Sequence, residues 1–177
     1  MRTLKYAILG LINQKPMTGY DLMQYFESTM NEFWSAKHSQ IYPELKKLTE
    51  EGAIVYEEIE QDGSPNKKVY SITEAGKKDF AKWLSSDNAD ITTPKDTFRL
   101  RLFFSSEMPE EDRDFLLQSH LLQHKNRLKH LKDNQSKFTD IPSKDDPTFG
   151  DYLVLMGAIM REENTIAWIE KCIKMYK

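Results

Sequence analysis

The sequence predicts a mainly α-helical protein, with an N-terminal winged helix-turn-helix followed by a C-terminal dimerisation domain of long helices. Apolar residues recur with the helical period through most of the 177 residues. Between residues 54 and 72 the pattern changes once to that of short β-strands. Beyond residue 94 the pattern is helical again, and no glycine occurs there before Gly150.

Composition and charge exclude several classes of protein. The chain is 39% hydrophobic and 11% aromatic, which is enough for a packed core. We expect a cytoplasmic protein without a membrane partner, because no signal-peptide pattern opens the sequence and no apolar run reaches the length of a membrane span. A formal net charge of −3 argues against coating nucleic acid through bulk positive charge, so DNA binding would need local basic clusters. The single cysteine, Cys172, excludes an intramolecular disulfide.

The first two helices are predicted from the spacing of their apolar residues. Residues 4–12 carry an apolar stripe at the i, i+3, i+4, i+7 spacing, and Pro16 ends this segment. A second helix opens at Thr18, because Asp21 follows three positions later and the pair can satisfy free backbone N–H groups. Its apolar face consists of Leu22, Phe26 and Met30.

A third helix is predicted at residues 37–51. Ile41, Leu45 and Leu48 lie at i, i+4 and i+7, so they face inward together. Gly52 stands where a helix C-terminus favours glycine. Three short helices in succession indicate a helix-turn-helix core.

A two-stranded hairpin follows the third helix. Residues 54–56 and 68–72 are β-branched and aromatic, and the turn-forming residues 62–66 join them. Two strands alone are marginally stable, so the hairpin must pack against the helices, as the wing of a winged helix does.

A fourth helix completes the N-terminal domain. It opens at residue 73 and carries Phe80, Trp83 and Leu84 on one face. The polar segment 85–93, followed by Pro94, marks the domain boundary. We therefore expect a winged helix-turn-helix domain at residues 1–85 and a helical dimerisation and effector domain at 94–177.

The C-terminal domain is predicted to contain helices at 95–104, 109–138 and 151–176. The two long helices each carry an apolar seam like that of a coiled coil. The seams consist of Leu117, Leu121, His124, Leu128 and Leu131, and of Leu155, Ile159, Glu162, Ile166, Ile169 and Ile173. These seams predict a homodimer, because a second copy of the chain is the simplest partner. The alternative, a two-helix hairpin within one chain, would leave one seam partly exposed.

Motifs of enzymes and metal sites are missing from the sequence. It has no glycine-rich phosphate loop, no HExxH and no GxSxG. His120 and His124 share one helix face, but no acidic residue or cysteine accompanies them as a further ligand in sequence. We expect neither an enzyme nor a bound metal or cofactor.

The outer face of the third helix is the best candidate for binding DNA. Glutamine can pair with adenine, and lysine or histidine can reach guanine. The N-terminal residues of a recognition helix meet base edges, and a wing beside it can touch phosphate. The candidate residues are Lys37, His38, Ser39, Gln40, Tyr42, Lys46 and Lys47 on the helix, with Lys67 and Lys68 on the wing. The alternative is an exposed polar helix beside a solvated hairpin.

Several motifs resemble the PadR family of bacterial transcriptional regulators. They are LGLI at 9–12, PMTGYDL at 16–22, QIYPELKKL at 40–48 and KVYSITEAG at 68–76. The run EFWSAKHSQ at 32–40, together with residues 152–155, Arg161, Glu162 and Trp168, is similar to the founding, phenolic-acid-responsive branch of that family.

The resemblance implies a homodimeric repressor that binds a palindromic operator in double-stranded DNA. In the founding branch, a hydroxycinnamic acid such as p-coumarate or ferulate binds between the two domains and releases the DNA. Other branches respond to drugs and control multidrug efflux genes, which is the alternative function. A protein-interaction adaptor that uses the long helices without DNA is a further alternative.

A phenolic acid needs an apolar slot, aromatic walls and a cation for its carboxylate. Side chains of these kinds occur in both domains, although each could equally belong to the core or to an interface. The candidates are Tyr6, Phe98, Arg101, Tyr152, Met156 and Arg161.

Overall fold

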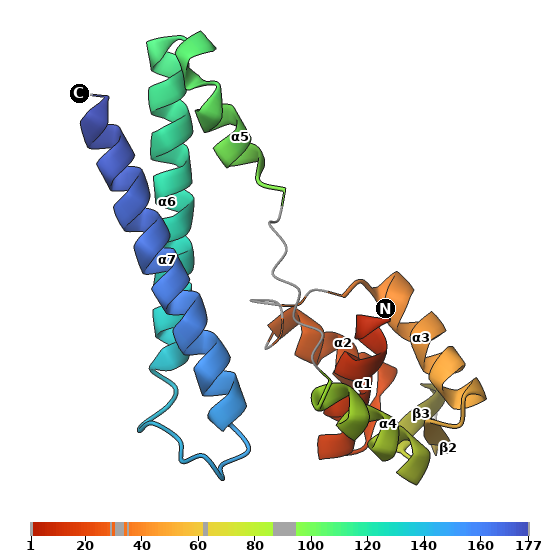
Figure 1. Cartoon of the computed structure of the whole chain (residues 1–177). Helices are drawn as coiled ribbons and strands as arrows, with labels where there is room; N and C mark the ends of the chain where they lie inside the picture. Colours follow the sequence, from red (N-terminus) through yellow and green to blue (C-terminus); the bar gives the residue numbers. More distant parts are fainter. Residues whose placement is uncertain are drawn as a thin grey trace. The chain divides into compact units, whose positions relative to one another are not determined.

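The computed structural model describes residues 2–28, 30, 34, 36–61, 64–86 and 95–176. Two compact units make up the chain, unit 1 at Met1–Asp90 and unit 2 at Ile91–Lys177 (Figure 1). The segment predicted as the domain boundary falls largely on residues 87–94, outside the described residues.

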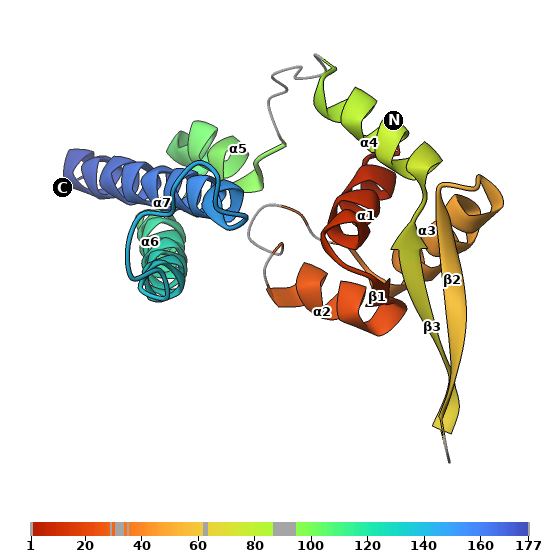
Figure 2. The same ribbon diagram turned by 90° about the horizontal axis from the view of Figure 1, so that it is seen from below.

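Unit 1 is a winged helix-turn-helix, which confirms the predicted fold class (Figure 2). Its described elements are α1 (Thr3–Gln14), β1 (Met17–Thr18), α2 (Gly19–Ser28), α3 (His38–Glu50), β2 (Ile54–Gln61), β3 (Ser64–Ile72) and α4 (Glu74–Leu84). The strands form an antiparallel sheet in the order β1-β3-β2. The strand β1 was not predicted, because two residues are too few to display a strand period.

The core of unit 1 is built from the faces that the apolar spacing predicted. Leu22 and Phe26 of α2 and Ile41, Leu45 and Leu48 of α3 are all buried in one cluster with α1. Burying each such side chain contributes about 1.5–3 kcal/mol, so this cluster holds the three helices together.

Helix α4 packs on α1 through aromatic side chains. The Trp83 ring stacks on Tyr6 with centroids 4.7 Å apart, and the Phe80 ring lies against Gly10. The prediction that Leu84 shares this face was wrong, because Leu84 is the last residue of α4 and is exposed.

Local signals at the helix ends are confirmed. The Asp21 carboxylate accepts a hydrogen bond from the Thr18 backbone N–H at 2.9 Å, and the Thr18 hydroxyl oxygen accepts one from the Asp21 N–H at 3.1 Å. Hydrogen bonds from the Thr18 hydroxyl and backbone lower the pKa of Asp21. Gly52 ends α3 with φ of +69°, a left-handed conformation that favours glycine.

The hairpin is longer than predicted. Residues 64–66 belong to β3 rather than to the turn, and Gln61 pairs with Ser64. A proline at position 65 is compatible with this strand, because β1 pairs with β3 only at Val69 and Tyr70 and leaves the edge beside Pro65 without a neighbour.

Unit 2 consists of α5 (Thr97–Phe103), the short 3-10 turn η1 (Ser105–Glu107), α6 (Glu110–Gln135) and α7 (Phe149–Met175). The long helices α6 and α7 lie side by side and antiparallel (Figure 1). Two ion pairs of 2.8 Å cross between them, Lys125 to Glu170 and Lys132 to Glu163.

The two predicted seams pack against one another within a single chain. Leu117, Leu131 and Ile169 are buried in the α6–α7 hairpin, in contact with partners from unit 2 itself. The alternative, a two-helix hairpin within one chain, is therefore what the structure contains, and Leu121, Leu128 and Ile166 of the seams are only half-buried in it.

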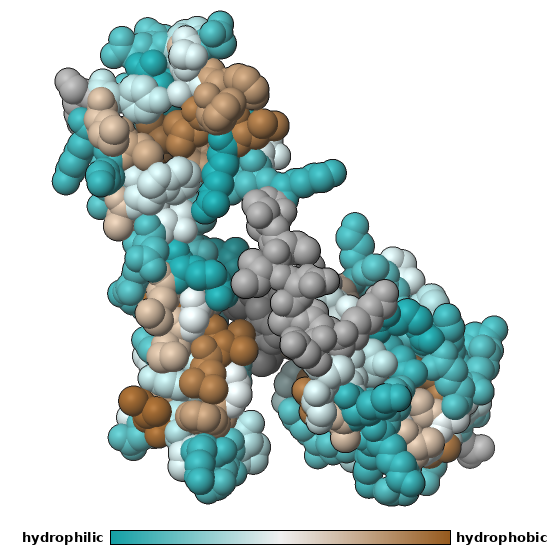
Figure 3. Space-filling model, viewed as in Figure 1, coloured by the Kyte–Doolittle hydropathy of each residue, from teal (hydrophilic) through white to brown (hydrophobic). Residues whose placement is uncertain are grey.

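Unit 2 instead exposes apolar side chains on other surfaces. Leu100, Phe103 and Phe104 of α5 and the residue after it, which we call the α5 patch, are 59%, 80% and 55% exposed. Hydrophobic atoms gather at the end of unit 2 where α5 lies (Figure 3). Exposed apolar patches of this kind mark surfaces that bind a partner.

Close packing between α4 and the start of β2 predicts that Gly76→Ala destabilises the protein. A Cβ at Gly76 would lie 2.1 Å from the Ala53 carbonyl oxygen and 2.9 Å from Ile72 Cγ1. We expect a loss of about 1–3 kcal/mol in the free energy of unfolding, measured by urea denaturation. Gly150→Ala in α7 is the control, because nothing lies within 4 Å of its Cβ position. Equal stability of the two variants would contradict this packing.

Candidate nucleic-acid interface and effector residues

The outer face of α3 presents the predicted DNA-binding residues to solvent. Burial of Ile41, Leu45 and Leu48 turns the opposite face of the helix outward. All of the predicted residues on this helix and the preceding position are exposed, namely Lys37, His38, Ser39, Gln40, Tyr42, Lys46 and Lys47. The structure thus brings these residues together on one surface.

Tyr42 connects the first turn of α3 to the start of α2. A Cβ at Gly19 would lie 2.8 Å from Tyr42 Cε1, so only glycine leaves room for the ring there. The His38 ring also lies beside Tyr42, with the two ring centroids 4.8 Å apart. These contacts orient both side chains at the N-terminal end of α3.

Gln40 already takes part in the N-terminal cap of α3. Its side-chain oxygen accepts a hydrogen bond from the Lys37 backbone N–H at 3.0 Å. Bidentate pairing with adenine uses both the oxygen and the NH2 group of a glutamine. To pair with adenine through both groups, Gln40 would therefore have to break the hydrogen bond that its oxygen accepts from Lys37.

A network of charges, which we call the α3 clamp, holds the recognition helix against α1 and α4. Arg2 makes ion pairs with Glu44 and Glu51, both on or directly after α3. Lys5 pairs with Glu51 at 3.1 Å and with Asp79 of α4 at 2.7 Å. The hydrogen bond from Arg2 is the main cause that lowers the pKa of Glu51.

The sequence analysis did not identify the α3 clamp. Its five members lie on three helices or directly beside them, and the contacts join residues up to 49 positions apart. The only local signal is that Glu44 and Glu51 are seven residues apart, which places them on one face of a helix.

The two wing lysines have different surroundings. The Lys68 ammonium lies 3.3 Å from the Glu58 carboxylate and 4.2 Å from the centre of the Tyr56 ring. Hydrogen bonds to Tyr56 and then Glu58 raise the pKa of Lys68. Lys67 is also exposed, and its charge helps to lower the pKa of Asp21, so it lies near the start of α2.

The predicted effector residues do not form one cluster within unit 2. Phe98 is buried against His120, with ring centroids 3.8 Å apart, and edge-on to Trp168. Tyr152 packs instead on Phe138 near the start of α7. Sixteen residues of helix separate Tyr152 from Trp168, about 24 Å at the helical rise. A small acid in unit 2 cannot touch both Phe98 and Tyr152.

The remaining effector candidates lie apart from one another. Tyr6 belongs to unit 1, where it stacks on Trp83. Met156 and Arg161 are exposed on α7, and Arg101 is exposed on α5. The described residues surround three hollows in the protein surface. Arg101 lines one of these three, and the other candidates in unit 2 line none of them.

The histidines of α6 pair with protein groups. His124 Nδ1 is in hydrogen-bond contact with the carboxylate of the buried Glu162, which Arg127 also contacts at 3.2 Å. Burial is the first cause that lowers the pKa of His120, followed by the nearby His124. Over the described ranges, no three histidine, cysteine or acidic side chains gather as a metal site. Nor does any described helix have the apolar length that a bilayer span requires.

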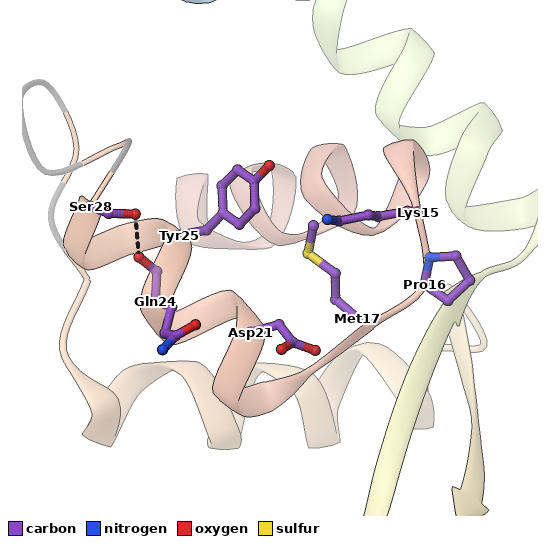
Figure 4. Close-up of a pocket in the computed structure, with 7 residues that line it drawn as sticks. All are labelled: Lys15, Pro16, Met17, Asp21, Gln24, Tyr25 and Ser28. Carbon is purple, nitrogen blue, oxygen red and sulfur yellow. Dashed lines mark hydrogen bonds between the residues drawn. The ribbon is translucent and has the colours of Figure 1, made fainter. Parts of the chain in front are cut away.

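A hollow of about 380 Å³ lies in unit 1 between the end of α1 and α2 (Figure 4). It is lined by Lys15, Pro16, Met17, Asp21, Gln24, Tyr25 and Ser28. The Lys15 ammonium lies 5.7 Å from the centre of the Tyr25 ring. Most of the lining is polar, which is unlike the apolar slot that an aromatic acid needs.

Comparison with known proteins identifies the family. Residues 8–82 match the transcriptional regulator PadR-like family, and residues 94–177 match the C-terminal domain of virulence activator alpha. The negative transcriptional regulator PadR of Bacillus subtilis is 40% identical over 178 residues, covering 99% of this chain and 98% of that protein. The chain belongs to the PadR family. The resemblance in the sequence motifs is thereby confirmed.

Solved PadR structures match nearly the whole chain. Bacillus subtilis PadR in complex with operator DNA has a TM-score of 0.93 and 41% identity, covering 99% of this chain and 100% of that one. The same protein in complex with p-coumaric acid has a TM-score of 0.87 and 40% identity, covering 99% of each chain. This PadR-family chain is therefore similar to a regulator that has been crystallised with DNA and with a phenolic acid.

Proposed function

We propose that this protein is a homodimeric transcriptional repressor that binds a palindromic DNA operator and is released by a hydroxycinnamic acid. The observation that carries the proposal is the similarity, over 99% of the chain, to Bacillus subtilis PadR in complex with operator DNA. A regulator of this kind needs no catalytic machinery, and it works in the cytoplasm beside the chromosome.

The chemistry of α3 supports DNA reading. Its N-terminal turn offers His38, Ser39 and Gln40 to base edges, while Lys46 and Lys47 further along suit phosphates. Tyr42 is held at the same end by Gly19 and His38, ready to contact the groove wall. The wing adds a cation at Lys67.

The α3 clamp explains how a chain with a net charge of −3 can approach DNA. Glu44 and Glu51 are paired with Arg2 and Lys5. Glu50 lies 3.9 Å from the Lys46 ammonium. Pairing the carboxylates with cations of unit 1 reduces their repulsion of phosphate, so the lysines dominate the outer face.

A phenolic acid is the favoured effector. Bacillus subtilis PadR, at 40% identity, has been solved in complex with p-coumaric acid, and unit 2 of this chain contains five of the six arginines, which can bind a carboxylate. We therefore favour a phenolic acid over the drugs of the efflux alternative.

The α5 patch is the surface that we assign to the dimer. It presents three large apolar side chains in the unit that matches the C-terminal domain of virulence activator alpha. A second copy would bury them, and the two winged units of a symmetric dimer match the two half-sites of a palindrome.

Phe103→Asp should break the dimer, because a charge would then lie in the apolar contact. We expect light scattering to give the molar mass of a monomer, and operator affinity to fall. Ile141→Asp is the control, since Ile141 is also exposed but lies in the loop between α6 and α7. A Phe103→Asp protein that stays dimeric would place the interface elsewhere.

Gln40→Ala and Lys67→Ala should weaken operator binding in different ways. Loss of a base contact at Gln40 should cost about 1–3 kcal/mol per half-site and relax preference at one base pair. Loss of a phosphate contact at Lys67 should weaken all sequences alike and reduce the salt dependence by about one unit of slope per half-site. Lys78→Ala on α4 is the charge-matched control. Unchanged base preference in Gln40→Ala would exclude direct reading by that residue.

p-Coumarate should release the operator from the dimer. Lowering occupancy from about 99% to about 1% requires the acid to favour the non-binding state by about 10⁴-fold, which two bound molecules can share. Fluorescence anisotropy of labelled operator during titration with p-coumarate measures this, with acetate as the control for ionic strength. Binding of p-coumarate without any change in operator affinity would exclude it as the effector.

A further inference from the structure

Helix α5 is docked on the α6–α7 hairpin through a histidine ring. The Phe98 ring of α5 is buried and stacks on His120 of α6, with the ring centroids 3.8 Å apart and an angle of 22° between the planes. Phe98 also meets Trp168 of α7 edge-on, with 5.8 Å between the centroids. His120 therefore forms part of the surface on which α5 rests, and a change in its charge acts directly on that contact.

The surroundings of the His120 imidazole disfavour its protonated form. Its Nδ1 atom is buried and has no hydrogen-bond partner among the described residues. Both ring nitrogens of a protonated histidine are donors, so a charged His120 would leave a buried N–H without an acceptor. Burial is accordingly the first cause that lowers the pKa of His120.

The charged groups around His120 do not offset this burial. His124 on the same helix and Arg101 on α5 also lower the pKa of His120, because positive charge beside the ring opposes a second positive charge. Asp96, directly before α5, acts in the opposite direction. Its carboxylate is already engaged, since it accepts a hydrogen bond from the Arg99 backbone N–H at 2.9 Å and pairs with the Arg99 side chain at 3.2 Å.

His124, one turn further along α6, has the acidic partner that His120 lacks. Its Nδ1 contacts the carboxylate of Glu162 on α7, which Arg127 also contacts. The other titratable residue of α7 nearby, Cys172, packs in the same apolar cluster as α5. A proton on His124 would thus face a carboxylate, whereas a proton on His120 would lie against a buried aromatic ring. Acidification therefore acts against the α5 contact and leaves the α6–α7 contact paired.

We propose that His120 is a proton sensor, which holds α5 on the α6–α7 hairpin when it is neutral and releases α5 when it is protonated. Release of α5 would weaken operator binding, because α5 bears the α5 patch that we assign to the dimer. It also directly follows, in sequence, the segment that joins the two units. The effect on the operator rests on the proposed function, whereas the docking of α5 does not.

The direction of the pH dependence follows from the lowered pKa of His120. When α5 is released, the ring titrates near the ordinary histidine value of about 6.5, and when α5 is docked it titrates below that value. Docking is therefore strongest above about pH 6.5, weakens as the pH falls toward the pKa of the docked state, and weakens no further below it. Each pH unit between the two pKa values weakens docking about tenfold.

Two measurements on the full chain test the sensor. An NMR titration of the His120 ring should give a pKa below the ordinary histidine value, and it uses the wild-type protein alone. Hydrogen exchange of the α5 amides, corrected for the intrinsic effect of pH on exchange, should become about three- to tenfold faster between pH 7.5 and pH 5.5. The amides in the middle of α6 and α7 should keep their protection over the same range.

His120→Phe retains an aromatic ring against Phe98 and cannot be protonated, so the corrected exchange of α5 should no longer depend on pH. His130→Phe is the matched control, because it makes the same substitution at an exposed position of α6 and should keep the wild-type pH dependence. Operator affinity should fall more steeply on acidification in the wild type and in His130→Phe than in His120→Phe. His38 of α3 is present in all three proteins, so its own titration cancels in this comparison.

The possible results separate the sensor from the proposed function. A His120 pKa at or above the ordinary value, or equal pH dependence of α5 exchange in the wild type and in His120→Phe, would overturn the sensor. If α5 exchange follows the expectation but operator affinity changes equally with pH in all three proteins, the sensor stands and its effect on the operator is wrong. If the wild type does not bind its operator at pH 7.5, the proposed function is wrong, and the NMR and exchange results still decide the sensor because they need no DNA.

Discussion

Burial of one face of α3 is the constraint on which the DNA-binding surface depends. Ile41, Leu45 and Leu48 are all buried in the core of unit 1, which fixes the rotation of the helix about its own axis. A shift of one residue in that register would turn the helix by about 100° and send the basic residues toward the core. The identity of the outward residues therefore follows from three apolar side chains that never touch DNA.

Packing sets the rotation of α3, and ion pairs then orient its acidic side chains. Arg2 and Lys5 of the α1 region bind Glu44 and Glu51, so these two carboxylates are turned toward α1 and away from the outer face of α3. Lys5 also binds Asp79, which ties the same network to α4. Partly exposed pairs contribute little to stability individually. Their larger effect is to keep negative charge away from a surface that must meet phosphate.

The sequence revealed local structure well and long-range contacts poorly. The spacing of Leu22 and Phe26, and the Thr18–Asp21 cap, were sufficient to locate α2. The pairing of β1 with β3 and the α3 clamp depend on residues far apart, for which a single sequence carries no signal. The effector residues were chosen by chemical type alone. The chemical type of a residue does not tell where in the fold its side chain lies. Phe98 and Tyr152 accordingly lie in different clusters of unit 2.

A ligand in unit 2 can act on DNA binding only if it binds two conformations of the protein with different affinity. The α6–α7 hairpin is a poor candidate for such a change, because a long buried seam and several ion pairs hold it. Helix α5 has only 7 residues and contributes Phe98 and Leu102 to the unit 2 core. It also follows directly in sequence the segment that joins the two units. Among the helices of unit 2, the short α5 is therefore better suited to such a change than the α6–α7 hairpin.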